Sequence, residues 1–204
     1  ARAAKSRGWL RLLSDEVRGQ RFQWEALKLV ATAQWDVKDY EGARHNWETL
    51  RETHPHDIEA NLALANIYER LYRELQRSEW IEASEQAIDR VIDNRSTSSK
   101  QRAEALALQG RNQKTRWRLE FEGLKTPEER RAAAMNRALI RSYEAYRHAF
   151  LEDLNHYYSG LNALQMGTLL FDLSKDDTWY PAFESDPQAE SYRVELEAQI
   201  SSLR

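Results

Sequence analysis

The sequence predicts an all-α fold, a right-handed α-solenoid of about nine helices arranged as stacked helical hairpins. Only seven glycines and four prolines occur in 204 residues, and charged side chains make up 31%. Apolar residues recur at helical spacing rather than in strand alternation. The hydrophobic fraction of 41%, with seven Trp and nine Tyr, is large enough to form a continuous core.

The most regular helix pair runs from Trp24 to Asp57. Its pattern follows the 34-residue tetratricopeptide repeat (TPR), in which small residues mark the crossing of a first helix, A, with a second, B. The positions that fit are Leu27, Val30, Ala31, Gln34, Tyr40, Ala43, Trp47, Leu50 and Pro55. Gln34 departs from the usual aromatic residue. After Pro55, Asp57 is expected to cap the next helix.

The pattern returns 34 residues later as Asn61, Leu64, Ala65 and Tyr68. The second helix of this repeat comes late, because about six extra residues lie near 73–77, and Ser78 is its predicted N-cap. A third A-type helix begins within the polar run 96–99, whose hydroxyls can cap it, and continues to about Trp117.

Helix signals in the last third of the chain begin at Thr126. Thr126 can cap, Pro127 suits the first helical position, and Glu129 can reach back to the cap amide, so a long helix to about Glu152 is expected. A fourth A-type helix is expected over 158–169. A terminal helix starts at Asp186-Pro187, with a core stripe of Tyr192, Leu196 and Ile200.

These elements predict one domain over residues 1–204. We expect an N-terminal capping helix within 1–22, repeats over 23–173, and a loop with a C-terminal capping helix over 174–204. Because the chain begins without Met, we also expect it to be part of a longer protein.

Two stretches carry a more specific resemblance: residues 103–111 with Lys114 and Trp117, and residues 143–163. They resemble the TPR-type, TRAF-binding regulatory region that precedes the kinase domain in apoptosis signal-regulating MAP3 kinases, and related bacterial TPR domains. The resemblance covers roughly residues 24–173. It implies a scaffold or sensor arm that controls an attached effector, and it implies no catalytic residues.

The A-helix registers predict a concave wall that binds a protein or peptide partner, because stacked repeats form an extended groove. Its predicted partner-binding residues are Lys28, Thr32, Trp35, Asn66, Arg70, Arg111, Lys114 and Asn162. In chaperone-binding members of the broader repeat family, a Lys and an Asn four residues apart, together with further basic groups, bind the terminal carboxylate of a peptide. Lys28 is followed by Thr32, so that arrangement is incomplete.

The alternative function is a sensor for an anionic, nucleotide-like ligand that controls an attached effector. Arg111, Lys114 and Arg118 share one helix face and could bind such an anion, although an ordinary solvated face fits the same pattern.

No enzyme motif is present, and we expect no catalytic residues, no cofactor and no metal. His54 and His56 flank a proline turn without completing a ligand set. The net charge of −3 argues against nucleic acid, and no apolar run is long enough to cross a membrane. The absence of cysteine favours a cytoplasmic protein.

The two ends carry opposite charge, which predicts possible head-to-tail self-association. Residues 1–21 hold six basic and two acidic side chains, and residues 172–204 hold eight acidic and three basic ones. Trp179 and Tyr180 fall outside any helix stripe, so this aromatic pair is expected either to pack against the end of the repeats or to mark a contact surface.

Overall fold

The structure, a computed structural model, describes the backbone of residues 2–203 and the side chains of residues 6–203. Every regular element in that range is helical: ten α-helices and one short 3-10 helix, with no strand. The predicted all-α class of TPR-like hairpins is confirmed, with one helix more than expected. The chain divides into two compact units, unit 1 (residues 1–97) and unit 2 (residues 98–204).

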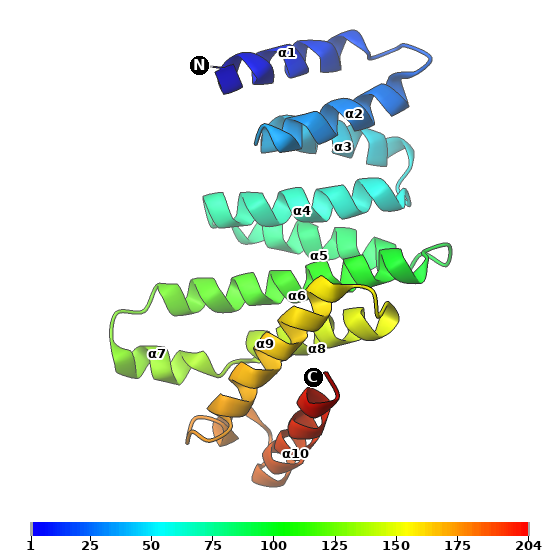
Figure 1. Cartoon of the computed structure of the whole chain (residues 1–204). Coiled ribbons are helices and arrows are strands. Elements are labelled where there is room, and N and C mark those ends of the chain that lie inside the picture. Colours follow the sequence, from blue (N-terminus) through cyan, green and yellow to red (C-terminus); the bar gives the residue numbers. More distant parts are fainter. Residues whose placement is uncertain (1, 204) are drawn as a thin grey trace. The chain divides into compact units, whose positions relative to one another are not determined.

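Unit 1 contains five helices, each packed on the next along the chain (Figure 1). They are α1 (Arg2–Glu16), α2 (Gln23–Asp36), α3 (Tyr40–Thr53), α4 (Ile58–Leu75) and α5 (Ser78–Ile92). The pairs α2–α3 and α4–α5 are the two predicted repeats. Ala31, Ala43 and Ala65 are completely buried at the crossings, and Ser84 Oγ of α5 donates to the carbonyl of Ala65 at 2.8 Å. Small side chains therefore let the paired helices approach closely.

Unit 2 is built around α8, which packs against both α6 and α9, while α10 packs on α9 (Figure 1). Its elements are α6 (Ser99–Glu122), α7 (Pro127–Ala134), α8 (Arg137–Glu152), α9 (Tyr157–Leu173), η1 (Tyr180–Ala182) and α10 (Asp186–Leu203). The fourth A-type helix and the terminal helix are confirmed, and Leu196 and Ile200 of the predicted stripe are buried. The single-domain assignment of residues 1–204 stays a prediction.

Most of the predicted helix starts are confirmed. The Asp57 carboxylate accepts the amide of Ala60 at 2.8 Å. Thr126 forms a complete capping box with Glu129, and Ser98 forms one with Gln101. The prediction for Ser78 is wrong, because Ser78 is already the first residue inside α5. The N-cap is Arg77, whose side chain makes no capping hydrogen bond.

The extra residues before Trp80 lengthen α4 rather than form a loop. This helix runs for 18 residues and ends where Gln76 adopts a left-handed conformation, with a φ of 54°. Residues 73–75 thus extend α4, and residues 76 and 77 connect it to α5.

The single long helix predicted from Thr126 to Glu152 is wrong, because the chain breaks at Met135 and Asn136. Met135 is extended and buried, and the Asn136 side chain caps α8 by accepting the amide of Leu139 at 3.1 Å. Trp117 Nε1 donates to the carbonyl of Ala134 at 2.9 Å, which satisfies an acceptor at the end of α7. Burial of Met135 and the Asn cap together favour two helices.

Polar side chains replace the expected aromatic contact at Gln34. Ser14 donates to Asn46 Oδ1 at 2.6 Å, and Asn46 Nδ2 donates to Gln34 Oε1 at 2.7 Å. All three side chains are buried. This chain of hydrogen bonds joins α1, α2 and α3, so the departure from the repeat pattern attaches α1 to the first repeat.

An ion pair fixes α1 at the same place. Arg11 donates through Nε and Nη2 to the two carboxylate oxygens of Asp39 at 3.0 and 2.6 Å. Asp39 also accepts the amide of Gly42 as the N-cap of α3. Arg7 donates to the carbonyls of Val37 and Lys38 in the preceding turn. The α2–α3 turn is thereby bound to two arginines of α1.

Aromatic side chains fill the core of unit 2. Trp179 is fully buried, its Nε1 donates to the carbonyl of Ala189 at 3.2 Å, and its ring lies 4.8 Å from that of Phe183. Of the two roles expected for this residue, packing against the end of the repeats is therefore the correct one. Gly110 faces Tyr146 so closely that a methyl group added there would lie 2.9 Å from the tyrosine ring.

We predict that Asp39→Asn makes the protein less sensitive to acid. Arg11, acting first through its hydrogen bond, lowers the pKa of Asp39 in the folded state. The folded carboxyl therefore stays ionised at a pH where the unfolded one, with a pKa of about 3.9, takes up a proton. Its stabilisation is complete above that pKa and is lost as the pH falls through the folded value.

Urea unfolding at about pH 5 and about pH 3 measures this effect. Between the higher and the lower pH, the free energy of unfolding of the wild type should fall further than that of Asp39→Asn. The asparagine is a matched variant because it retains a capping side chain. Equal losses in the two proteins would contradict the prediction.

We predict that Gly110→Ala destabilises the protein by up to about 2 kcal/mol. Replacing a helical glycine by alanine normally gains about 1 kcal/mol, but overpacking a rigid core costs about 1–3 kcal/mol. The control is Gly123→Ala, where the nearest atom to an added methyl lies 3.7 Å away. Urea unfolding should show Gly123→Ala at least as stable as the wild type. Equal stability of the two variants would contradict this packing.

Candidate partner-binding site

A hollow of about 350 Å³ lies between the neighbouring A-type helices of unit 1. Its lining residues are Thr32 and Trp35 of α2, Trp47 of α3, and Ala63, Asn66 and Ile67 of α4. Three of these, Thr32, Trp35 and Asn66, are predicted binding residues that the fold brings together. We call this hollow the α2–α4 pocket.

The α2–α4 pocket has an apolar floor and polar groups at its edge. Trp47 and Ile67 are buried, whereas Trp35 is half-buried and packs against Tyr40 with ring centroids 5.2 Å apart. Thr32 Oγ1 donates to the carbonyl of Lys28 at 2.8 Å. The pocket can therefore bury an apolar group against aromatic rings, with amide and hydroxyl groups beside it.

Lys28, another predicted binding residue, does not line the α2–α4 pocket. Its Nζ lies 3.2 Å from Asp57 and 2.7 Å from Glu59, at the start of α4. The hydrogen bond to Glu59 is the main reason that the pKa of Lys28 is raised. Because two carboxylates already neutralise it, Lys28 ties α2 to α4 in this structure.

In unit 2 the predicted residues Lys114 and Asn162 lie together. Lys114 Nζ donates to Asn162 Oδ1 at 3.1 Å and to Gln165 Oε1 at 3.2 Å, which bridges α6 to α9. Within residues 6–203, no carboxylate lies within ion-pair distance of Lys114. Burial lowers its pKa, with a further contribution from Arg118. The ammonium group is therefore partly desolvated and held by neutral amides.

The other two predicted residues are half-buried: Arg70 lies one turn after Asn66 on α4, and Arg111 lies on α6. Neither lines the α2–α4 pocket. The assignment of the eight residues to one partner-binding surface stays a prediction.

Ser159, His156 and Glu104 form a line that resembles a hydrolytic triad. His156 Nδ1 lies 2.7 Å from Ser159 Oγ, and His156 Nε2 lies 3.0 Å from Glu104 Oε2. Ser159 is completely buried in the first turn of α9, so a substrate carbonyl has no access to its hydroxyl. The arrangement joins the start of α9 to α6.

The His54–Pro55–His56 turn makes structural contacts. His54 lies edge-on to Trp24, with ring centroids 5.7 Å apart, and His56 provides a carbonyl that accepts from Asn94 at 3.1 Å. Among the described side chains, no group of three His, Asp or Glu residues could hold a metal ion. None of the helices within residues 2–203 is long and apolar enough to cross a membrane.

Many of the charges near the two ends are paired within their own unit. Arg11 pairs with Asp39 in unit 1, while in unit 2 Asp176 pairs with Arg131 and Glu190 pairs with Arg193. The side chains of Arg2, Lys5 and Arg204, which contribute to the predicted end charges, lie outside the described residues. Head-to-tail association stays a prediction.

The pocket floor and one partner of Lys114 were not predicted from the sequence. Trp47 was assigned to the core, yet it also lines the α2–α4 pocket. Gln165 follows Asn162 by three residues, so helical spacing alone places both on one face, and that signal could have identified it.

Paired helices, small residues at their crossings and a hollow between consecutive A-type helices define a TPR-type repeat protein. A family model described as Tetratricopeptide Repeats-Sensor (TPR-S) matches residues 39–170, and the chain belongs to this family. Searches of curated proteins and of solved structures found no match. The resemblance to apoptosis signal-regulating kinases gains no support from these comparisons and stays a prediction.

Proposed function

We propose that this chain is a non-enzymatic interaction domain that binds a protein or peptide partner through the A-type helices. It would act as a scaffold or regulatory arm of a larger cytoplasmic signalling or defence protein. Membership of the TPR-S family supports a sensor or interaction role, and TPR-type repeat domains are generally non-catalytic.

The observation that carries this proposal is the α2–α4 pocket. Its volume of about 350 Å³ lies at the lower end of the range for ligand pockets, about 300–1,000 Å³. It is therefore suited to one bulky apolar side chain of a partner. The half-buried Trp35 of α2 provides a ring for stacking, and the amide of Asn66 lines the same pocket from α4.

We predict that filling the pocket abolishes tight peptide binding. Peptides selected from a random display library on the wild-type protein should share a bulky apolar residue. Ala63→Phe should weaken their affinity about tenfold or more, because the new ring occupies the space of the partner side chain. Fluorescence anisotropy with labelled peptides measures the dissociation constants.

The matched control is Leu29→Ala, which changes α2 at a site that is 73% exposed and does not line the pocket. The selected peptides should bind Leu29→Ala with the same affinity as the wild type. Equal binding by Ala63→Phe, with its fold verified by circular dichroism, would exclude the α2–α4 pocket as the binding site.

A second candidate function is supported by Lys114. A partly desolvated ammonium group held by amide oxygens, as Lys114 is, can bind an anion more strongly than a surface lysine can. This favours the alternative role, in which unit 2 senses an anionic, nucleotide-like ligand. The two functions use different units, so they can be tested separately.

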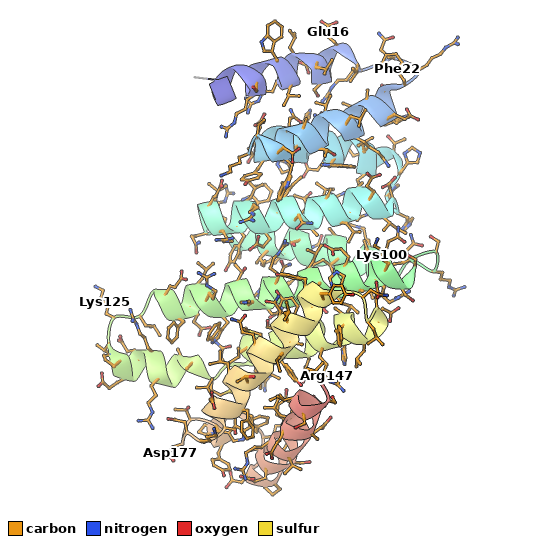
Figure 2. All side chains as sticks on the ribbon, in the orientation of Figure 1. Glu16, Phe22, Lys100, Lys125, Arg147 and Asp177 are labelled. Carbon is orange, nitrogen blue, oxygen red and sulfur yellow. The ribbon has the colours of Figure 1, made fainter. Side chains whose placement is uncertain are left out.

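We predict that millimolar pyrophosphate, ADP or ATP raises the melting temperature of the wild-type protein, since ligand at 100 times its dissociation constant stabilises by about 2.7 kcal/mol. Lys114→Gln should abolish the rise. Lys100→Gln, an exposed lysine on the same helix (Figure 2), should not change it. No rise, or an equal rise in both variants, would count against the anion site.

A further inference from the structure

A second hollow of unit 1, about 300 Å³ in volume, lies between α1 and the first repeat. Its walls include Arg11, Ser14 and Asp15 of α1, Gln34 of α2, and His45 and Asn46 of α3. We call it the α1–α3 pocket. It shares no lining residue with the α2–α4 pocket, and among the described residues every side chain that lines it is polar. The pocket is therefore suited to a small polar molecule rather than to an apolar side chain.

Gln34 brings to this pocket a buried hydrogen-bond donor that the protein does not use. The residue is 1% exposed, and its Oε1 accepts from Asn46 at the end of the hydrogen-bonded chain that begins at Ser14. Among the described residues, none accepts a hydrogen bond from Gln34 Nε2. A buried polar group without a partner is unfavourable, so an acceptor in the pocket, either water or a bound molecule, has to complete the chain.

The unused amide of Gln34 lies where positive charge is in excess. A methyl group added at Gly42 would lie 2.6 Å from both Gln34 Nε2 and Asp39 Oδ2, so Nε2 is near the Arg11–Asp39 ion pair. Arg11 through its hydrogen bond, and Arg7 through its charge, both lower the pKa of Asp39. Arg11 uses Nε and Nη2 for this carboxylate, which leaves Nη1 as a donor. Two arginines beside one aspartate favour an anionic group of the ligand here.

One helical turn further along α1, the pocket presents acceptors. Ser14 uses its hydroxyl proton for Asn46, so its oxygen can still accept a hydrogen bond. Asp15 is 77% exposed, and within the described residues its ion pair is with Arg18 at 3.9 Å. This end favours a cationic group. Because Arg11 and Asp15 are about 6 Å apart along the helix, a ligand that reaches both carries its two charges only a few bonds apart.

Two exposed side chains of α3, Glu41 and His45, also line the pocket. Glu41 Oε2 accepts from Arg44 Nε and Nη2 at 3.0 and 2.9 Å, so its charge is already balanced. The ring of His45 makes no hydrogen bond within the described residues and can contact the ligand. Asp15 is therefore the main partner for a cation.

We propose that the α1–α3 pocket binds a free α-amino acid, in which one carbon carries both charged groups. The carboxylate accepts from Gln34 Nε2 and from Arg11, and the ammonium group donates to Asp15 and to the oxygen of Ser14. The ligand then ties α1 to the first repeat, so α1 responds to the concentration of the amino acid. This site is independent of the proposed partner-binding pocket, because the two share no residue.

The test is isothermal titration calorimetry of the full chain with each of the standard amino acids. At least one should bind with a dissociation constant below about 1 mM. For that ligand, Asp15→Asn should weaken binding about tenfold, because it removes the charge that faces the ammonium group. Glu16→Gln removes the neighbouring exposed carboxylate, which lies outside the pocket, and should bind like the wild type. Circular dichroism checks that both variants are folded.

Ligand analogues test the two ends of the pocket separately. The N-acetyl derivative lacks the ammonium group and the corresponding amine lacks the carboxylate, so each should bind the wild type about tenfold more weakly. Asp15→Asn should not weaken the N-acetyl derivative further, because the partner of Asp15 is already absent. Gln34→Met should weaken the amino acid but not the amine. If this buried substitution prevents folding, the amine still tests the donor end.

Three results would overturn the proposal. One is that none of the amino acids binds, which would leave water as the occupant of the pocket. Another is equal affinity of Asp15→Asn and the wild type. The last is an amine or an N-acetyl derivative that binds as tightly as its parent amino acid.

Discussion

The small residues at the helix crossings determine how closely the helices of each unit can pack. Ala31 and Ala43 are completely buried in the first repeat, and in unit 2 Gly110 lies directly against Tyr146. At Gly110 a single added methyl group has no space, because packed interiors deform little. This close approach keeps large side chains such as Trp47 near the neighbouring A-type helix. The α2–α4 pocket therefore depends on residues that do not line it.

Polar residues provide a second constraint in unit 1. A repeat with the usual aromatic residue at position 34 would pack α2 on α3 by apolar contact alone. Gln34 instead continues a buried chain of hydrogen bonds from Ser14 and Asn46, and the Arg11–Asp39 ion pair lies beside it. Buried polar groups are costly unless all are satisfied, so this network specifies one placement of α1 on the first repeat.

Much of the fold could be predicted from periodicity and capping residues, as Asp57 and the Thr126 box show. The break at Asn136 could not, because it depends on the burial of Met135 and on the bond from Trp117 to α7. In the site, Trp35 and Asn66 were predicted from their register. The direction of Lys28 depends on Glu59, which lies 31 residues away, and local patterns carry no information about such a contact.

The proposed function requires that a partner side chain enters the α2–α4 pocket. The most direct measurement is the set of indole N–H resonances of the seven tryptophans during titration with a selected peptide. If a partner enters the pocket, the Trp35 resonance should shift in proportion to bound peptide, while the resonance of Trp179, buried in unit 2, should stay unchanged. An unchanged Trp35 resonance at saturating peptide would show that the partner does not bind in the α2–α4 pocket.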